Sequence, residues 1–264
     1  MVDSSIRQES CSSAQLAPLR AVATAGIVPF GDLHAHCTTC GVRTLCLPSG
    51  LDPEALKRLD ESVGVRTRVK RKASLYRPGD RFAAVYAIRI GTFKTVVLAE
   101  DGREQVTGYR MAGEIIGLDG IGADHFTCQA TALEDSEVCV LPFHQLDELG
   151  REFPALRHNV LRAMSRDLAR EQSMMLLLGS RSAEERLALF LLDIAERYQA
   201  RGYSAREFVL RMTREEIASF LGLKLETVSR IFSSLQENGH IQVQGRAVKL
   251  LDSAALRRLV GQAA

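Results

Sequence analysis

The stretch TREEIASFLGLKLETVSR, residues 213–230, decides the fold of the C-terminal part of the chain. Thr213 stands three residues before Glu216, which is the spacing of a capping box at the start of a helix. Gly222 then interrupts the helical pattern, and a second helix is expected over residues 223–236. Two short helices joined by a tight glycine turn predict a helix-turn-helix.

Polar residues near the start of the second helix predict contact with DNA, because the N-terminal part of a recognition helix meets base edges. Arg230 can donate two hydrogen bonds to guanine, Glu226 can accept one from cytosine, and Ser229 can contact a neighbouring base. The apolar residues are expected on the buried face of this helix: Leu225, Val228, Ile231, Phe232 and Leu235. The alternative is a plain helical hairpin whose charged side chains are only solvated.

The residues that follow predict a β-hairpin wing. Two short apolar runs, at residues 241–243 and 248–250, flank the pair Gly245-Arg246. Arg246 would lie at the tip of this hairpin, where a guanidinium suits a DNA phosphate. A further capping box, from Ser182 to Glu185, predicts the helix that precedes the helix-turn-helix.

Upstream, residues 65–141 show short β-like runs separated by turns. Four glycines recur every 11 or 12 residues: Gly79, Gly91, Gly102 and Gly113. Turn residues at that interval predict an antiparallel barrel or sandwich of short strands. The fold class is therefore expected to be α+β, with an N-terminal antiparallel β domain and a C-terminal winged helix-turn-helix.

A long helix is expected between these two parts, from Pro154 to about residue 178. Its apolar residues fall on one face: Leu156, Val160, Met164, Leu168, Met175 and Leu178. A single long stripe predicts the seam of a dimer, and the alternative is a helix packed on its own domain. Glu171 lies inside the stripe, where burying a carboxylate without a partner is costly. A symmetric dimer would bring two such carboxylates together, so Glu171 is the expected dimer switch, with Leu168, Met164 and Met175 around it.

Three of the six cysteines lie close together, in the pattern Cys37-x2-Cys40-x5-Cys46. Thiolates bind soft metals and iron–sulfur clusters. Zinc sites usually show a second close pair of ligands, although His34 and His36 leave a Cys/His zinc site open. Three ligands in a loop plus one distant ligand are typical of a [4Fe–4S] cluster. The candidates for the fourth ligand are Cys128 and Cys139, while Cys128 also fits a buried strand thiol and Cys11 is expected to be free.

Composition places the chain among ordinary globular proteins. The 264 residues are 46% hydrophobic and 25% charged, with a net charge of +2, and are enough for two domains. Neither a membrane-spanning run nor a secretory signal is evident, so a cytoplasmic location without membrane contact is expected. An enzyme that uses the CxxC for redox chemistry is disfavoured, because no βαβ pattern surrounds Cys37 and Cys40.

These motifs together resemble the FNR-type oxygen-sensing regulators of the CRP/FNR superfamily. The resemblance runs from about His36 to the end of the chain. It rests on the cysteine triplet and on three further segments, EVCVLPF (137–143), SAEERL (182–187) and GLKLETVSR (222–230).

The resemblance implies a β-roll sensor domain, a long dimer helix and a winged helix-turn-helix. It selects Cys139 as the fourth ligand of a [4Fe–4S] cluster and Glu226, Ser229 and Arg230 as the base-reading residues. It also implies a homodimer that forms under low oxygen and binds inverted-repeat operators with TTGAT-like half-sites, with RNA polymerase as a further partner. The expected division is a loose tail over 1–35, a cluster loop and β-roll over 36–150, a dimerisation helix over 151–180 and a DNA-binding domain over 181–264.

Three features depart from the family pattern. The tail before the cysteines is long and has no assigned role. Lys224 stands where a Ser or Thr cap is usual, and losing such a cap costs about 1 kcal/mol. The segment 123–127 lacks the arginine that anchors a cyclic nucleotide in the CRP branch, which weakens the alternative of a small-effector regulator on the same fold.

Overall fold

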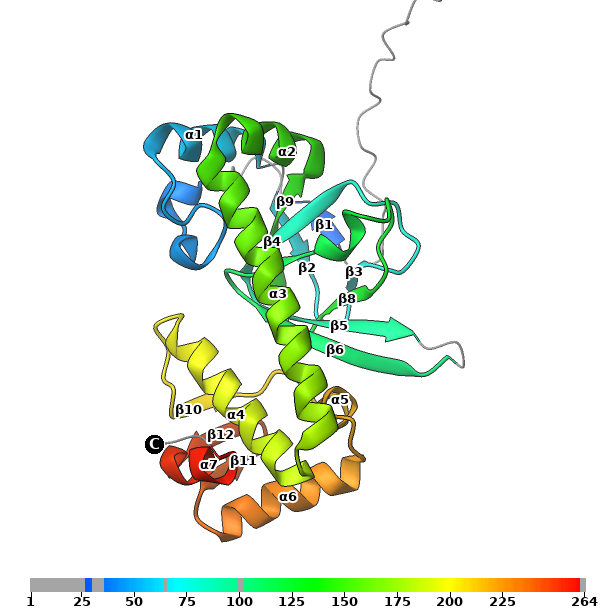
Figure 1. Cartoon of the computed structure of the whole chain (residues 1–264), viewed down its shortest axis with the longest axis vertical. Coiled ribbons are helices and arrows are strands. Elements are labelled where there is room, and N and C mark those ends of the chain that lie inside the picture. The colour runs from blue at the N-terminus through cyan, green and yellow to red at the C-terminus, as the bar shows by residue number, and fades with distance from the viewer. Residues whose placement is uncertain (1–26, 30–35, 64–65, 99–101, 262–264) are drawn as a thin grey trace, which may run out of the picture.

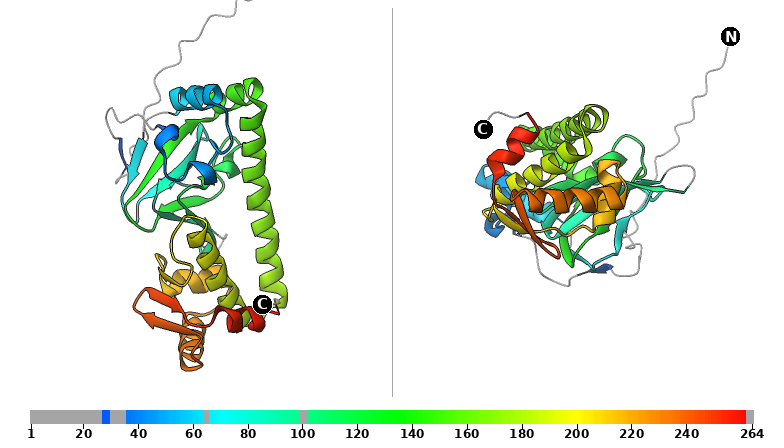
Figure 2. Two further views of the ribbon diagram at one scale, coloured as in Figure 1. Left: turned by 90° about the vertical axis from the view of Figure 1, so that its left-hand side faces the viewer. Right: turned by 90° about the horizontal axis from the view of Figure 1, so that it is seen from below.

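The computed structural model describes residues 27–29, 36–63, 66–98 and 102–261. An N-terminal β domain and a smaller C-terminal domain lie along one long helix, α3 (Pro154–Ser180), which passes both of them (Figures 1 and 2). Of the expected tail, only Ile27–Pro29 belongs to the described residues. These form strand β1, which pairs with β2 (Arg66–Val69), so this part was wrongly expected to be loose.

The N-terminal domain contains two antiparallel sheets, as the spacing of the glycines predicted. One sheet has the strand order β1-β2-β9-β4-β7 and the other β3-β8-β5-β6. The remaining strands are β3 (Ser74–Tyr76), β4 (Ala84–Ile90), β5 (Thr92–Leu98), β6 (Glu104–Met111), β7 (Ile115–Ile116), β8 (Gln129–Ala132) and β9 (Ser136–Pro142). Gly91 joins β4 to β5 at φ 99°, and a Cβ there would lie 2.1 Å from Ser136 Oγ, so only glycine fits this turn.

Two helices close one end of the β domain. They are α1 (Pro53–Ser62) and α2 (Phe143–Glu152), and Asp52 caps α1 through hydrogen bonds from the backbone of Glu54 and Ala55. Their apolar faces and the start of α3 cover Val85 and Leu141 of the sheet. Leu156 is fully buried in this core and Val160 packs against it, so both were wrongly assigned to the dimer seam.

Further along α3, large apolar side chains are exposed. Leu161, Leu168 and Met175 are 57%, 57% and 66% exposed, and Met164 is 38% exposed. Together with Glu171, which is also exposed, they follow steps of three and four residues. We call these five residues the α3 seam. Their spacing is that of a two-stranded coiled coil.

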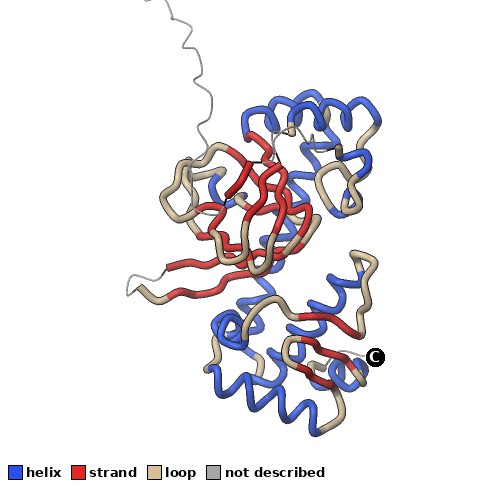
Figure 3. Tube along the Cα trace, turned by 180° about the vertical axis from the view of Figure 1, so that it is seen from behind, coloured by secondary structure: helices blue, strands red, loops and turns tan. Residues whose placement is uncertain are grey.

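The C-terminal domain is a winged helix-turn-helix, as predicted (Figure 3). Its helices are α4 (Ala183–Gln199), α5 (Arg214–Leu221), α6 (Leu225–Glu237) and α7 (Ser253–Leu259), and its strands are β10 (Glu207–Val209), β11 (Ile241–Gln244) and β12 (Ala247–Leu250). Both predicted capping boxes are present, at Ser182 and at Thr213. Gly222 ends α5 in the left-handed conformation at φ 62°. Strand β10, which the sequence did not indicate, pairs with β12.

Candidate nucleic-acid interface and metal centre

Helix α6 presents its polar residues to the outside. Glu226, Ser229 and Arg230 are exposed, while Val228 and Leu235 on the other face are fully buried. No hydrogen bond or ion pair within the described part of the chain engages the side chain of Glu226 or Arg230, so both are available to an external partner. Leu225 was wrongly expected on the buried face. It is 42% exposed, because it is the first residue of the helix.

The position of α6 is fixed by contacts that sequence reasoning missed. The Arg214 guanidinium at the start of α5 lies 3.1 Å from the centroid of the Phe232 ring, and its burial lowers the pKa of Arg214 to about 10. Gln236 accepts a hydrogen bond from the backbone N–H of Val243 at 2.8 Å, which ties α6 to the wing. Lys224 provides no side-chain cap for α6, as its residue type predicted.

The wing is a hairpin with a two-residue turn at Gly245-Arg246. Arg246 is exposed there, and its Nη1 donates to the backbone oxygen of Arg211 at 3.3 Å. The tip and the exposed face of α6 belong to one small domain, which suits simultaneous contact with phosphates and base edges.

Four of the cysteines surround one small cavity. Cys37, Cys40 and Cys46 come from a loop of two 3₁₀ turns, and Cys139 comes from β9. The cavity has about 30 Å³ of free space, and Leu47, Leu59, Val63 and Leu141 are among its apolar walls. Cys128 lies elsewhere, buried beside the Tyr76 hydroxyl at 4.0 Å. The structure therefore brings together the four cysteines that the resemblance selected and leaves Cys128 apart.

Burial raises the pKa of Cys46 to about 12 and that of Cys139 to about 11, and it raises that of Cys37 still further. Guanidinium groups oppose this effect, those of Arg66 and Arg89 at Cys139 and that of Arg166 at Cys46. Metal binding by these thiols would therefore release protons and place thiolates next to positive charge.

The described residues contain no preassembled site for a single metal ion. Within the described ranges, no three His, Cys, Asp or Glu side chains are placed so that they could hold one. His36 is not among the residues that line the cavity, and its Nδ1 lies 3.9 Å from Asp60 Oδ2. His34 lies outside the described residues. A [4Fe–4S] cluster instead takes one thiolate at each of four separate iron atoms, so sulfurs that surround a volume are suited to it.

The segment that would hold the phosphate of a cyclic nucleotide is occupied by a carboxylate of the chain itself. Asp119 Oδ2 accepts hydrogen bonds from Thr127 N at 2.8 Å, Thr127 Oγ1 at 3.1 Å and Cys128 N at 3.2 Å. An anion that approached these donors would meet this negative charge, and residues 123–127 supply no arginine to offset it. Arg110 lines the same pocket but is already paired with Asp167 at 3.5 Å. This geometry disfavours the small-effector alternative.

An exposed polar face on the second helix of a winged helix-turn-helix defines a DNA-binding transcription regulator. Residues 185–259 match the Crp-like helix-turn-helix domain, and residues 66–153 match the cyclic nucleotide-binding domain. The transcriptional activator protein Anr of Pseudomonas aeruginosa is 44% identical over 228 residues, which cover 86% of this chain and 93% of that protein. The chain belongs to the CRP/FNR superfamily of transcription regulators and is of the FNR type.

Two further comparisons agree with this assignment. The fumarate and nitrate reduction regulatory protein of Salmonella typhimurium is 40% identical over 234 residues, which cover 89% of this chain and 94% of that protein. The structure of FixK2 from Bradyrhizobium japonicum matches with a TM-score of 0.69 and 28% identity, covering 75% of this chain and 97% of that one. No helix of the described residues is long and apolar enough to cross a membrane.

Proposed function

We propose that this regulator senses oxygen through a [4Fe–4S] cluster held by Cys37, Cys40, Cys46 and Cys139. The observation that carries the proposal is the enclosure of one cavity by these four side chains, beside the guanidinium groups of Arg66, Arg89 and Arg166. These guanidinium groups favour thiolates over thiols and an anionic cluster–thiolate assembly, and Glu137, which pairs with Arg66 and Arg89, offsets part of their charge. When bound, such a cluster supplies sensitivity to oxygen.

The size of the cavity indicates what the loop must do. About 30 Å³ is room for little more than a water molecule. Holding four iron and four sulfide ions therefore requires the loop from Cys37 to Cys46 to move outward. Cys139 is held between β2 and β4, opposite Arg66 and Ala87, so it is the fixed ligand and the loop is the adjustable part.

We propose further that the α3 seam forms a homodimer and that dimerisation controls DNA binding. The exposed apolar side chains of the seam favour association, and the two Glu171 carboxylates oppose it. Operators are inverted repeats with TTGAT-like half-sites, one read by each α6, and RNA polymerase is the further partner expected of an activator. Since residues of one loop and one strand hold the cluster, its loss would release the loop and leave the carboxylate repulsion to separate the subunits.

The test is chemical analysis of the protein purified without oxygen. We expect about four iron and four sulfide ions per chain and a brown colour, and air should remove both the colour and the binding of operator DNA. Zinc without sulfide would contradict the cluster and indicate the zinc-binding alternative. A colourless protein that binds operator only with an added nucleotide would indicate the small-effector alternative.

Replacing Arg230 with alanine tests how α6 reads DNA. The exposed guanidinium is expected to make two hydrogen bonds to one guanine of each half-site, with Glu226 on the paired cytosine and Ser229 on a neighbouring base. The variant should lose roughly 1–3 kcal/mol of operator affinity per half-site and lose its preference at that base pair. The measurement is binding to a set of operators changed at single positions.

Arg246→Ala is the matched control, because the wing arginine is expected to contact a phosphate. It should weaken binding to all sequences about equally and reduce the dependence on salt. If Arg230→Ala keeps full discrimination among the operators, the assignment of α6 to the bases is wrong.

A further inference from the structure

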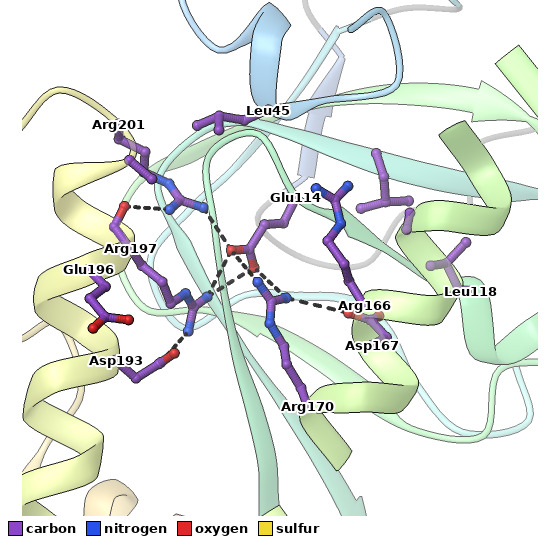
Figure 4. Close-up of a pocket in the computed structure, with 13 residues that line it drawn as sticks. Leu45, Glu114, Leu118, Arg166, Asp167, Arg170, Asp193, Glu196, Arg197 and Arg201 are labelled. Atoms are coloured by element: carbon purple, nitrogen blue, oxygen red, sulfur yellow. Dashed lines mark hydrogen bonds and ion pairs between the residues drawn. The ribbon is translucent and has the colours of Figure 1, made fainter. Parts of the chain in front are cut away.

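One carboxylate connects three parts of the molecule. Glu114 follows β6, and its side chain accepts hydrogen bonds from three guanidinium groups (Figure 4). Arg197 of α4 and Arg201, which lies just beyond the end of α4, approach its oxygens at 2.9 and 2.7 Å. Arg170 of α3 approaches at 3.3 Å. Glu114 thus joins the β domain to the long helix and to the first helix of the DNA-binding domain.

These charges are withdrawn from solvent. The side chains of Glu114 and Arg197 are 12% exposed and that of Arg201 is 7% exposed. Arg197 also donates to the backbone oxygen of Tyr109 at 2.7 Å, and Arg201 donates to that of Ala112 at 2.8 Å. The guanidinium groups hold the pKa of Glu114 at about 2 despite its burial. Moving the carboxylate would leave the buried Arg201 without its ion-pair partner and Arg197 with only the exposed Asp193, so the end of α4 is expected to follow the position of Glu114.

The cysteine loop rests on the neighbouring residue. Gly113 has φ 88°, and a Cβ there would lie 2.7 Å from Leu45 Cβ and 3.5 Å from Val42 Cβ. Both residues lie between Cys40 and Cys46. An outward shift of this loop would therefore remove the packing that covers Gly113, directly beside Glu114.

The same turn is also hydrogen-bonded to β4, which lines the cysteine cavity. Gly113 N donates to Ile88 O at 2.7 Å, and Ile88 N donates to Glu114 O at 2.9 Å. Ile88 lines the cavity in β4, next to Ala87, which is opposite Cys139. The turn thus contacts both the loop that carries three of the cysteines and β4, which lines the cavity.

We propose that Glu114 is a positioning residue that transmits the state of the cysteine loop to α3 and to the DNA-binding domain. The inference rests on the proposed cluster function. It adds a path that does not pass through the α3 seam. The path runs from the loop through Gly113 to Glu114, and from there to Arg170 on α3 and to Arg197 and Arg201 at the end of α4. Such a path is a coupling free energy between two sites, and it is measured as a ratio of affinities.

A second set of contacts, which does not involve Glu114, also joins the β domain to the DNA-binding domain. Lys94 of β5 forms an ion pair with Glu216 of α5 at 3.0 Å, and Ser219 of α5 accepts a hydrogen bond from Val106 N at 3.0 Å. These contacts are remote from the cysteine loop and do not involve Glu114. The C-terminal domain is therefore expected to stay docked when Glu114 is neutralised.

The experiment compares operator affinity with and without the cluster in the wild-type chain and in Glu114→Gln. In the wild type the loaded form binds more tightly. In Glu114→Gln this ratio should fall about tenfold, while the visible absorption of the loaded protein stays unchanged. A purely structural role would weaken both forms alike and leave the ratio intact.

Two further variants complete the design. Arg170→Gln removes the contact between Glu114 and α3 and leaves Glu114 paired with Arg197 and Arg201. The Arg170 side chain is 37% exposed, so this variant is expected to fold, and it decides the question if Glu114→Gln does not. Asp193→Asn is the control, because this exposed carboxylate pairs with the same Arg197 at 3.4 Å, and among the described residues it forms no hydrogen bond or ion pair with the β domain. An unchanged ratio in folded, cluster-loaded Glu114→Gln, or an equal fall in Asp193→Asn, overturns the inference. A wild-type chain that holds no cluster would instead overturn the proposed function itself.

Discussion

Replacing Cys139 with serine should abolish both the visible absorption of the anaerobically purified protein and its binding to operator DNA. Cys139 is the ligand supplied by the sheet, and the other three come from one short loop. Without it the loop would no longer be tied to β9, and a hydroxyl is a poor substitute for a thiolate toward iron. The same loss is expected for serine at Cys37, Cys40 or Cys46. Iron and sulfide content, absorption and DNA binding of each variant are the measurements.

Cys128→Ser is the matched control, since this thiol is buried in the same domain but lies beside Tyr76 instead of the cavity. It should keep a full complement of iron and sulfide, as should Cys11→Ser, whose position is outside the described residues. A normal cluster in the Cys139→Ser protein would disprove the ligand assignment. Loss of the cluster in Cys128→Ser would indicate Cys128 as a ligand.

Replacing Glu171 with alanine should yield a cluster-free protein that still dimerises and binds operator in air. The residue is exposed between Leu168 and Met175 of the α3 seam, where a dimer would have to remove it from water near its counterpart. If the opposing terms nearly balance, a change from mostly monomer to mostly dimer needs only about 5 kcal/mol. Removing the carboxylates supplies part of this energy without a cluster. Sedimentation at micromolar concentration measures the result.

Glu148→Ala provides the comparison, because this carboxylate is also exposed but lies on α2, away from the seam. It should leave the cluster-free protein monomeric. If cluster-free Glu171→Ala is monomeric as well, the element that opposes association lies elsewhere in the chain.

The C-terminal domain was the most predictable part, because its signals are local. The two capping boxes mark the starts of α4 and α5, and Gly222 marks the end of α5. Each signal lies directly beside the helix end that it predicts. Leu225 was the exception, since periodicity does not distinguish the first residue of a helix, which has no preceding turn to cover it, from one in its interior.

The long helix shows a different limit. Its apolar period was correct, but periodicity does not reveal what covers each part of a stripe. Leu156 and Val160 are covered by the β domain of the same chain, whereas Leu168 and Met175 remain exposed. The division between core and seam depends on which side of α3 the β domain covers at each position, since Arg170 still contacts Glu114 close to the exposed Leu168, and no local pattern marks that side.

The cysteine site was predictable only in part for a related reason. The spacing of Cys37, Cys40 and Cys46 indicated a ligand loop, but it left Cys128 and Cys139 open, and only the resemblance selected between them. The Glu114 contacts were missed altogether, because they join residues 56, 83 and 87 positions apart and leave no periodic trace. The hydrogen bonds that Asp119 accepts from Thr127 and Cys128 were also missed, because a single acidic residue in a sequence does not indicate which donors it will contact.

The length of α3 has a mechanical consequence. At a rise of 1.5 Å per residue, its 27 residues form a rod of about 40 Å that starts in the core of the β domain and ends where Leu178 meets Gly222 of the helix-turn-helix. A tilt of ~5° at the buried end displaces the far end of such a rod by about 3.5 Å, close to the axial rise of one base pair. Under the proposed function, a movement small enough to preserve the packing around Leu156 would be sufficient to shift α6 out of register with its half-site. The length of α3 would therefore amplify a small tilt at its buried end into a larger displacement of the DNA-binding domain, so a small change at the cysteines would be enough.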